Sequence, residues 1–133
     1  MRGSRVLVVE DNPLNRRLAV DVLRAVGYEV AEAEGAPEAR VRLQRSLPDC
    51  IVLDVRLPGA DGLALIEELR ADRRTAAIPI VATTALAMRS DRERILQAGV
   101  DAYLAKPFSP RVLGQVVGDL LKGRTDRAEA PRG

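Results

Sequence analysis

The sequence predicts a single α/β domain of the doubly wound type, with helices covering both faces of a parallel β-sheet. The main observation is that short stretches with the pattern of strands, most of them apolar, alternate with amphipathic stretches that have the pattern of helices. The second is size, because 133 residues provide one core and are too few for two ordinary domains. The third is composition, since 47% hydrophobic and 30% charged residues are typical of globular proteins.

Five short stretches are predicted as strands, of which the second, from Tyr28 to Ala33, alternates between apolar and polar residues while the others are mainly apolar. They are residues 5–10, 28–33, 50–54, 78–83 and 101–105. The third is apolar until its last residue, Asp54, after which Pro58 and Gly59 predict a turn. Pro79 is tolerated because it stands near the start of the fourth strand.

Five helices are predicted between and after these strands. They run from Pro13 to a capping Gly27, over 36–46, over 62–71, from 90 to 98 before Gly99, and from Pro110 through Leu121. Helical spacing of Leu14, Leu18, Val22 and Ala25 predicts the first. A capping box at Ser90 to Glu93 predicts the start of the fourth. Residues 123–133 show no periodicity, so a domain over 1–122 and a disordered tail over 123–133 are expected.

Composition excludes several classes of function. The chain has no histidine, which excludes a histidine base, histidine metal ligand or phosphohistidine within it. The net charge is +2 and the only aromatic residues are two Tyr and one Phe, so a base-stacking nucleic-acid surface is not expected. No apolar run is long enough to cross a bilayer. The opening residues lack the apolar core of a signal sequence, so export is not expected. A single cysteine, Cys50, also fits the reducing cytoplasm, where we expect the protein to reside.

Functional groups follow four of the five predicted strands. Glu10 and Asp11 end the first, Asp54 the third, Thr83 the fourth, and Lys106 follows the fifth. Because right-handed crossovers bring the carboxyl ends of parallel strands to one edge, we expect these side chains to meet there. Lys106 is notable because 19 of the 21 basic residues are arginine, which indicates that a compact ammonium is needed at this position.

Three clustered carboxylates without soft ligands suit a hard divalent cation, either Mg²⁺ or Mn²⁺. Asp54 is then the candidate nucleophile that takes a phosphoryl group as an acyl phosphate, while Lys106 and Thr83 contact phosphoryl oxygens. Each residue alone also has an ordinary structural explanation. Asp11 can cap a helix, Thr83 can be a plain strand residue, and Lys106 can be a surface charge. Their convergence favours the functional interpretation.

The chain resembles the receiver domains of two-component response regulators, especially single-domain regulators and the receivers of hybrid histidine kinases. The matching motifs are residues 9–15, 52–59 with 61–62, 79–88 and 98–108. The resemblance extends from about residue 4 to 122 without a missing element. It implies a flavodoxin-like fold with five parallel strands in the order 2-1-3-4-5 and five helices.

The resemblance also implies a mechanism. Asp54 would accept phosphate from a phosphohistidine on a histidine kinase or a histidine phosphotransfer protein, with Mg²⁺ held by Glu10, Asp11, Asp54 and the backbone carbonyl of Arg56. Thr83 and Tyr103 would form the switch that changes a protein-binding surface on the fourth helix, fifth strand and fifth helix. A cis peptide is expected between Lys106 and Pro107. Output would pass to a downstream protein effector, without direct nucleic-acid binding or membrane insertion.

Two other classes of function fit the sequence less well. A phosphohydrolase with an aspartyl-phosphate intermediate needs a second acid two residues after the nucleophile, where this chain has Arg56. A scaffold that works without phosphorylation does not need the complete set of acids, threonine and lysine. We therefore expect a signalling module that catalyses only its own phosphorylation and dephosphorylation, rather than an enzyme acting on external substrates.

Overall fold

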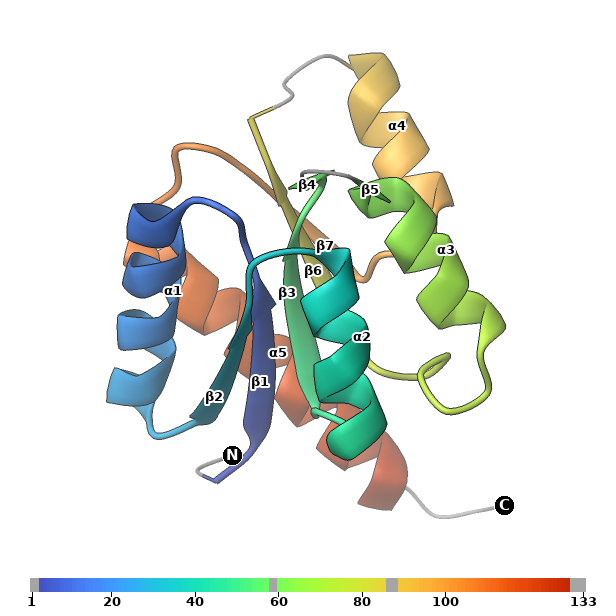
Figure 1. The fold of residues 1–133 in the computed structure, drawn as a ribbon. Coiled ribbons are helices and arrows are strands. Elements are labelled where there is room, and N and C mark those ends of the chain that lie inside the picture. The colour runs from blue at the N-terminus through green and yellow to red at the C-terminus, as the bar shows by residue number, and fades with distance from the viewer. Residues whose placement is uncertain (1–2, 58–59, 86–88, 130–133) are drawn as a thin grey trace.

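A computed structural model describes residues 3–57, 60–85 and 89–129, arranged as a parallel sheet between two layers of helices (Figure 1). The strands of this sheet are β1 (Arg5–Val9), β2 (Glu29–Ala33), β3 (Cys50–Asp54), β6 (Ile80–Thr84) and β7 (Ala102–Ala105). They pair in parallel in the order β2-β1-β3-β6-β7. In chain order this is 2-1-3-4-5, so the predicted doubly wound, flavodoxin-like topology is confirmed.

Within the described residues, five helices connect and cover the strands (Figure 1). They are α1 (Pro13–Val26), α2 (Ala36–Arg45), α3 (Gly62–Ala71), α4 (Arg89–Gln97) and α5 (Pro110–Glu129). Between β3 and α3, the short strands β4 (Arg56–Leu57) and β5 (Ala60–Asp61) pair antiparallel. The turn predicted at Pro58 and Gly59 lies outside the described residues. None of the described helices combines the length and apolar character required to cross a membrane.

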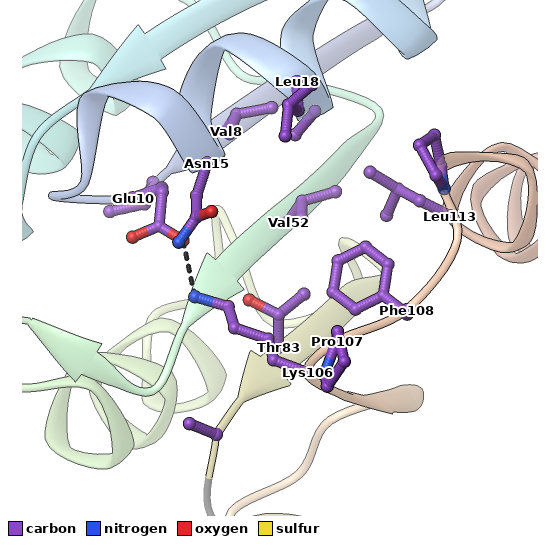
Figure 2. Close-up of a pocket in the computed structure, with 14 residues that line it drawn as sticks. Val8, Glu10, Asn15, Leu18, Val52, Thr83, Lys106, Pro107, Phe108 and Leu113 are labelled. Carbon is purple, nitrogen blue, oxygen red and sulfur yellow. Dashed lines mark hydrogen bonds and ion pairs between the residues drawn. The ribbon is translucent and has the colours of Figure 1, made fainter.

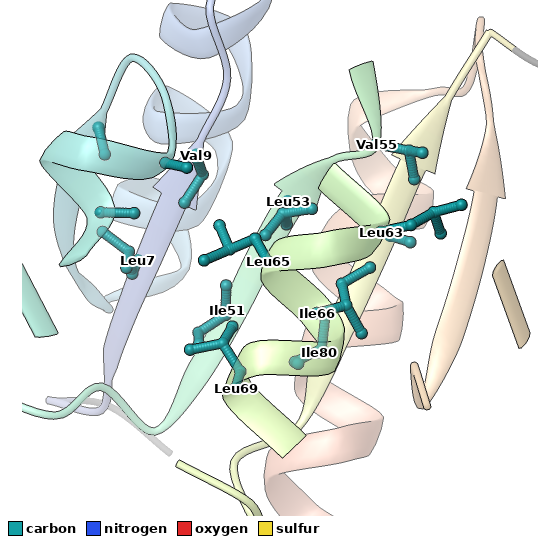
Figure 3. Packing of buried hydrophobic residues seen from close by; sticks show 14 of the residues in the cluster. Leu7, Val9, Ile51, Leu53, Val55, Leu63, Leu65, Ile66, Leu69 and Ile80 are labelled. Atoms are coloured by element: carbon teal, nitrogen blue, oxygen red, sulfur yellow. The ribbon is translucent and has the colours of Figure 1, made fainter. Parts of the chain in front are cut away.

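The core lies on both faces of the sheet. On one face, Ile51 and Leu53 of β3 pack beside Leu65 of α3 (Figure 3). Residues of α2 and the buried Ile95 of α4 belong to the same cluster. On the other face, Val6, Val8 and Val52 pack against α1 and α5. Burial on both faces explains why β1, β3 and β6 are almost continuously apolar. The edge strand β2 instead alternates between exposed and less exposed residues.

The buried face of α1 is not formed by the apolar residues at helical spacing from which the helix was predicted. Leu14 and Leu18 are 67% and 50% exposed, whereas Val20 and Leu23 are buried. Residues three and four apart share a helix face, and this buried face continues towards the helix start at Arg16, whose side chain is only 15% exposed. The buried face therefore begins with a charged residue, which an apolar pattern cannot reveal.

The helix ends agree with the predicted caps at several positions. The Asn12 side chain accepts a hydrogen bond from the Asn15 amide at 3.0 Å, and Gly27 closes α1. Ser109 Oγ accepts from the Val112 amide at 3.2 Å at the start of α5. At α4 the prediction differs, because the helix begins at Arg89 and thus includes Ser90 rather than starting after it as a cap.

The C-terminal helix is longer than expected, because α5 is helical through Glu129. The expected absence of regular structure from residue 123 is therefore wrong for the backbone of residues 123–129. Gly123 disfavours a helix by only about 1 kcal/mol relative to Ala, and the residues after it are compatible with a helix up to Pro131. The placing of a domain boundary at residue 122 stays a prediction.

Gly62 fixes how α3 starts beside the third strand. Its amide donates to the Val55 carbonyl at 3.0 Å, and a Cβ at this position would lie 2.3 Å from that carbonyl oxygen. Only glycine permits this close approach without backbone movement. The contact holds the end of β3, and with it Asp54, against the first turn of α3.

Candidate functional site

The predicted convergence of strand ends is confirmed at the carboxyl edge of the sheet. Asp54 is the last residue of β3 and pairs in register with Thr83 of β6. Glu10 follows β1, and Lys106 follows β7. Glu10, Asp54 and Thr83 are each 5% exposed or less, although all carry polar groups. Burial of polar groups at one edge is typical of a functional site rather than of a solvated surface.

Lys106 bridges the two buried carboxylates. Its Nζ donates to Glu10 Oε1 at 2.7 Å, the contact dashed in Figure 2, and to Asp54 Oδ2 at 3.0 Å. The peptide between Lys106 and Pro107 is cis, as predicted. One ammonium thus links strand ends that come from residues far apart in the sequence, and it places a positive charge directly beside the candidate phosphoacceptor.

The electrostatics of this cluster follow from burial and shared charge. Burial raises the pKa of the Glu10 carboxyl to about 7; the hydrogen bond from Lys106 opposes this rise, and neighbouring Asp54 adds to it. Burial lowers the pKa of Lys106, but its hydrogen bonds to Glu10 and Asp54 outweigh that effect and raise the pKa above its ordinary value. Lys106 therefore stays charged near neutral pH, whereas Glu10, with a pKa of about 7, changes between its protonated and ionised forms in that range.

Backbone contacts hold both carboxylates in place. The Glu10 amide donates to the Ala33 carbonyl at 3.0 Å, and Glu10 Oε2 accepts from the Asn12 amide at 3.1 Å. On the neighbouring strand, Asp54 Oδ1 accepts from the Arg56 amide at 2.9 Å. The Arg56 peptide, whose carbonyl was predicted as a metal ligand, is thereby kept at the site.

Three acidic residues form a candidate metal-binding cluster. Carboxylate oxygens of Glu10, Asp11 and Asp54 all lie within 4.8 Å of one another, and Asp11 is exposed while the other two are buried. An all-oxygen donor set of this kind fits a hard divalent cation. The residues present therefore suit the ion that the sequence predicted.

A cleft of about 470 Å³ opens next to these acids (Figure 2). Glu10, Thr83 and Lys106 line one part of it. Leu18 of α1, Leu113 of α5 and Phe108, which precedes α5, are among the apolar residues that line another part. The exposed Leu18 thus borders a hollow that leads to the polar edge. The sequence did not reveal this cleft, because it depends on the separation of α1 and α5 and not on any local pattern.

The structure does not bring together Thr83 and Tyr103, the predicted switch pair. Side chains alternate along a strand, and Val81 packs on the side of α1 and α5 while Ala82 packs on the side of α2, α3 and α4. Thr83 accordingly lies on the first side, where it lines the cleft, whereas Tyr103 packs on the second.

Thr84 is the threonine that shares the sheet face of Tyr103. It is fully buried, with 0% exposure, and it is the last residue of β6. The sequence offers two adjacent threonines at this strand end, and only the alternation of side chains between the faces separates their roles. Thr84 is therefore a candidate switch residue that sequence reasoning missed.

Comparisons with known proteins agree with this geometry. A model of the response regulator receiver domain family matches residues 6–118. The sensor protein GacS of Pseudomonas syringae pv. syringae is 43% identical over 119 residues, which cover 87% of this chain but only 13% of that protein. The polar-differentiation response regulator DivK of Brucella ovis is 41% identical over 109 residues, which cover 81% of this chain and 89% of that protein.

A solved structure has the same fold. The receiver domain of the sensor histidine kinase PA1611 from Pseudomonas aeruginosa PAO1 superimposes with a TM-score of 0.83 at 38% identity, covering 90% of this chain and 98% of that chain. That structure carries a magnesium ion coordinated in its active site cleft. The family match, the two relatives and the shared fold together show that this chain belongs to the response regulator receiver domain family of two-component signalling.

Proposed function

We propose that the chain is a single-domain response regulator whose Asp54 accepts a phosphoryl group from a phosphohistidine donor. The observation that carries this proposal is the arrangement of Asp54 between a buried acid, Glu10, and the ammonium of Lys106. Glu10, Asp11, Asp54 and the Arg56 backbone carbonyl are the proposed ligands of Mg²⁺, with Mn²⁺ as the alternative ion. The donor is a histidine kinase or a histidine phosphotransfer protein, because this chain has no histidine.

Each residue of the site has its own role in the transfer of the phosphoryl group to Asp54. An Asp54 carboxylate oxygen forms a bond to phosphorus while the bond from phosphorus to the donor imidazole nitrogen breaks, and the imidazole leaves with the electron pair. Lys106 exchanges part of its contact with Asp54 for a phosphoryl oxygen and stabilises the charge there. Mg²⁺ held by Glu10, Asp11 and Asp54 would supply further charge stabilisation for the phosphoryl oxygens. Burial of Glu10 and Asp54 keeps this charge arrangement in a low-dielectric setting.

The switch then connects the phosphorylated edge with a surface on α4, β7 and α5, which binds a downstream protein effector. The register pairing of Thr83 with Asp54 supports a contact between Thr83 and a phosphoryl oxygen, while Thr84 shares the sheet face of Tyr103. We therefore assign the switch to Thr84 and Tyr103. A shift from mostly inactive to mostly active requires about 5.5 kcal/mol of differential stabilisation, which several charge-assisted hydrogen bonds supply.

This function needs no external substrate turnover. The chain catalyses only its own phosphorylation and dephosphorylation, and Arg56 stands where a phosphohydrolase would carry its second acid. The protein works in the cytoplasm through protein contacts, without binding nucleic acid or inserting into membranes. GacS and DivK, a sensor protein and a response regulator by name, support a place in a phosphorelay.

The test is phosphoryl uptake from a small phosphodonor in the presence of Mg²⁺. Asp54→Asn is expected to abolish incorporation, because an amide is too weak a nucleophile to form the acyl phosphate. Asp21→Asn is the matched control, since it makes the same chemical change on the exposed face of α1, where the side chain is 62% exposed. Labelling of the Asp54 variant at the wild-type rate would overturn the assignment.

A further inference from the structure

We propose that Arg16 is a positioning residue for the acidic turn, acting on metal binding through the backbone of Glu10. The proposal rests on the proposed Mg²⁺ site at Glu10, Asp11 and Asp54. Arg16 is not one of the proposed metal ligands. It lies on α1, and its guanidinium Nη1 donates to the backbone carbonyl oxygen of Glu10 at 2.9 Å.

Arg16 fixes the turn from two sides. Its backbone amide donates to the Asn12 carbonyl at 2.9 Å, which closes the first turn of α1 directly after the acids. Its side chain holds the Glu10 carbonyl, while the Glu10 amide is held by Ala33 of β2 at 3.0 Å. Both the amide and the carbonyl of Glu10 are therefore fixed, so the peptide that carries the first acid into Asp11 has little freedom.

The guanidinium is itself held by two acids at the end of β2. Its Nε lies 3.3 Å from Glu32 Oε1, and its Nη2 lies 3.8 Å from Glu34 Oε1. The Arg16 side chain is only 15% exposed, whereas these glutamates are 41% and 73% exposed. The planar fork of arginine can make contacts in several directions at once, which a lysine ammonium on a flexible stem cannot match.

The position of Arg16 on the helix supports a specific role rather than a random surface charge. Arg16, Val20 and Leu23 lie on one face of α1, and the two apolar residues are buried against the sheet. A charged residue continuing that face needs partners for its guanidinium, and all of those observed belong to the ends of β1 and β2. Arg17, the next residue, has a side chain that is 79% exposed and lies 3.7 Å from Asp21.

Two explanations of the role of Arg16 predict opposite changes in Mg²⁺ affinity when its guanidinium is removed. If its charge alone mattered, removing a cation near three carboxylates would strengthen Mg²⁺ binding. If Arg16 positions the turn, its removal weakens Mg²⁺ binding, because the acids lose their fixed spacing. Loss of a group that orients a metal ligand typically weakens metal affinity by about tenfold or more. The direction of the change therefore separates the two explanations.

The experiment measures Mg²⁺ binding to the unphosphorylated protein by calorimetry, together with amide exchange of Asn12 in metal-free protein. Arg16→Met keeps the apolar stem and removes every donor. We expect its Mg²⁺ dissociation constant to rise about tenfold, and its Asn12 amide, which donates to Glu10 Oε2, to exchange faster. Arg17→Met is the matched control, with the same loss of charge on an exposed face, and it is expected to bind Mg²⁺ at least as tightly as wild type.

A second variant guards against loss of folding. Arg16→Lys keeps the charge but cannot hold Glu10 and Glu32 together, so a rise of about threefold in the dissociation constant is expected. Wild-type Mg²⁺ affinity in every Arg16 variant that folds would overturn the inference alone. A wild-type protein that binds no Mg²⁺ would instead overturn the proposed function, and with it the inference.

Discussion

Lys106 and Glu10 show most directly how single residues set the chemistry of this site. The Lys106 ammonium lies 2.7 Å from Glu10 and 3.0 Å from Asp54, so one cation serves two buried acids. One positive charge does not balance two carboxylates in a buried site. Burial therefore raises the pKa of Glu10 to about 7. A divalent cation held by Glu10, Asp11 and Asp54 would supply the missing charge, and its binding would then release a proton from Glu10.

Mg²⁺ binding should therefore depend on pH. Glu10 must be ionised to act as a ligand, so we expect apparent Mg²⁺ affinity to rise about tenfold from about pH 6 to about pH 8. Calorimetry in buffers of different ionisation enthalpy would measure both the affinity and the protons released. Glu10→Gln is the control and should flatten this pH dependence; an equally steep dependence in that variant would assign the titration to another group.

The same titration has the opposite effect on the metal-free fold. The pKa of Glu10 is about 7 in the folded protein, above its ordinary value of 4.5. Its contribution to the free energy of unfolding is therefore full below pH 4.5 and is lost as pH rises through about 7. Denaturant titrations in the presence of a chelator would detect this loss, and added Mg²⁺ should offset it.

At the residue scale, the sequence predicted most of the candidate site but not all of it. Glu10, Asp54 and Lys106 could be identified because each follows an apolar strand, and because lysine is rare in this chain. The roles of Thr83 and Thr84 could not be separated, since adjacent threonines look alike until the faces of the strand are known. Arg16 could not be identified either, because its partners lie on other elements.

At the scale of elements, side chains alternate between the two faces of the sheet along β6, and this alternation determines on which face each threonine lies. Thr83 lines the cleft beside α1 and α5. Thr84 lies on the opposite face of the sheet, where Tyr103 also packs. The buried face of helix α1 also differs from the one that the sequence pattern predicts. The exposed Leu14 and Leu18 suggested one face, whereas the helix is buried through Val20 and Leu23. In both cases the presence of the element was predicted, and its rotation relative to the core was not.

The two threonines can be separated by paired substitutions. With beryllofluoride as a phosphoryl mimic, we expect wild type and Thr83→Ala to change hydrogen exchange in α4 and β7, and Thr84→Ala to lose that change. Thr84 shares the sheet face of Tyr103, which explains the expected difference. Both variants delete a buried hydroxyl and methyl, so similar losses of about 1–2 kcal/mol in stability are expected. Loss of the response in Thr83→Ala alone would restore Thr83 to the switch.

At the scale of the whole molecule, topology converts residues distant in sequence into neighbours. The parallel order β2-β1-β3-β6-β7 places Glu10, Asp54 and Lys106 at one edge, and that order follows from strand and helix alternation together with right-handed crossovers. The extension of α5 to Glu129 was not predicted, because that segment lacks an apolar pattern. The cleft between α1 and α5 also depends on packing distances rather than on local sequence.

The central claim is that Asp54 carries the phosphoryl group, and covalent mapping tests it most directly. The protein would be phosphorylated with a small phosphodonor and Mg²⁺, reduced with borohydride, digested and analysed by mass spectrometry. Borohydride reduces an acyl phosphate to an alcohol, so the residue that carried phosphate is recovered as homoserine. We predict homoserine at position 54 and unchanged carboxylates at Glu10 and Asp11. Homoserine at another position, with Asp54 intact, would contradict the account.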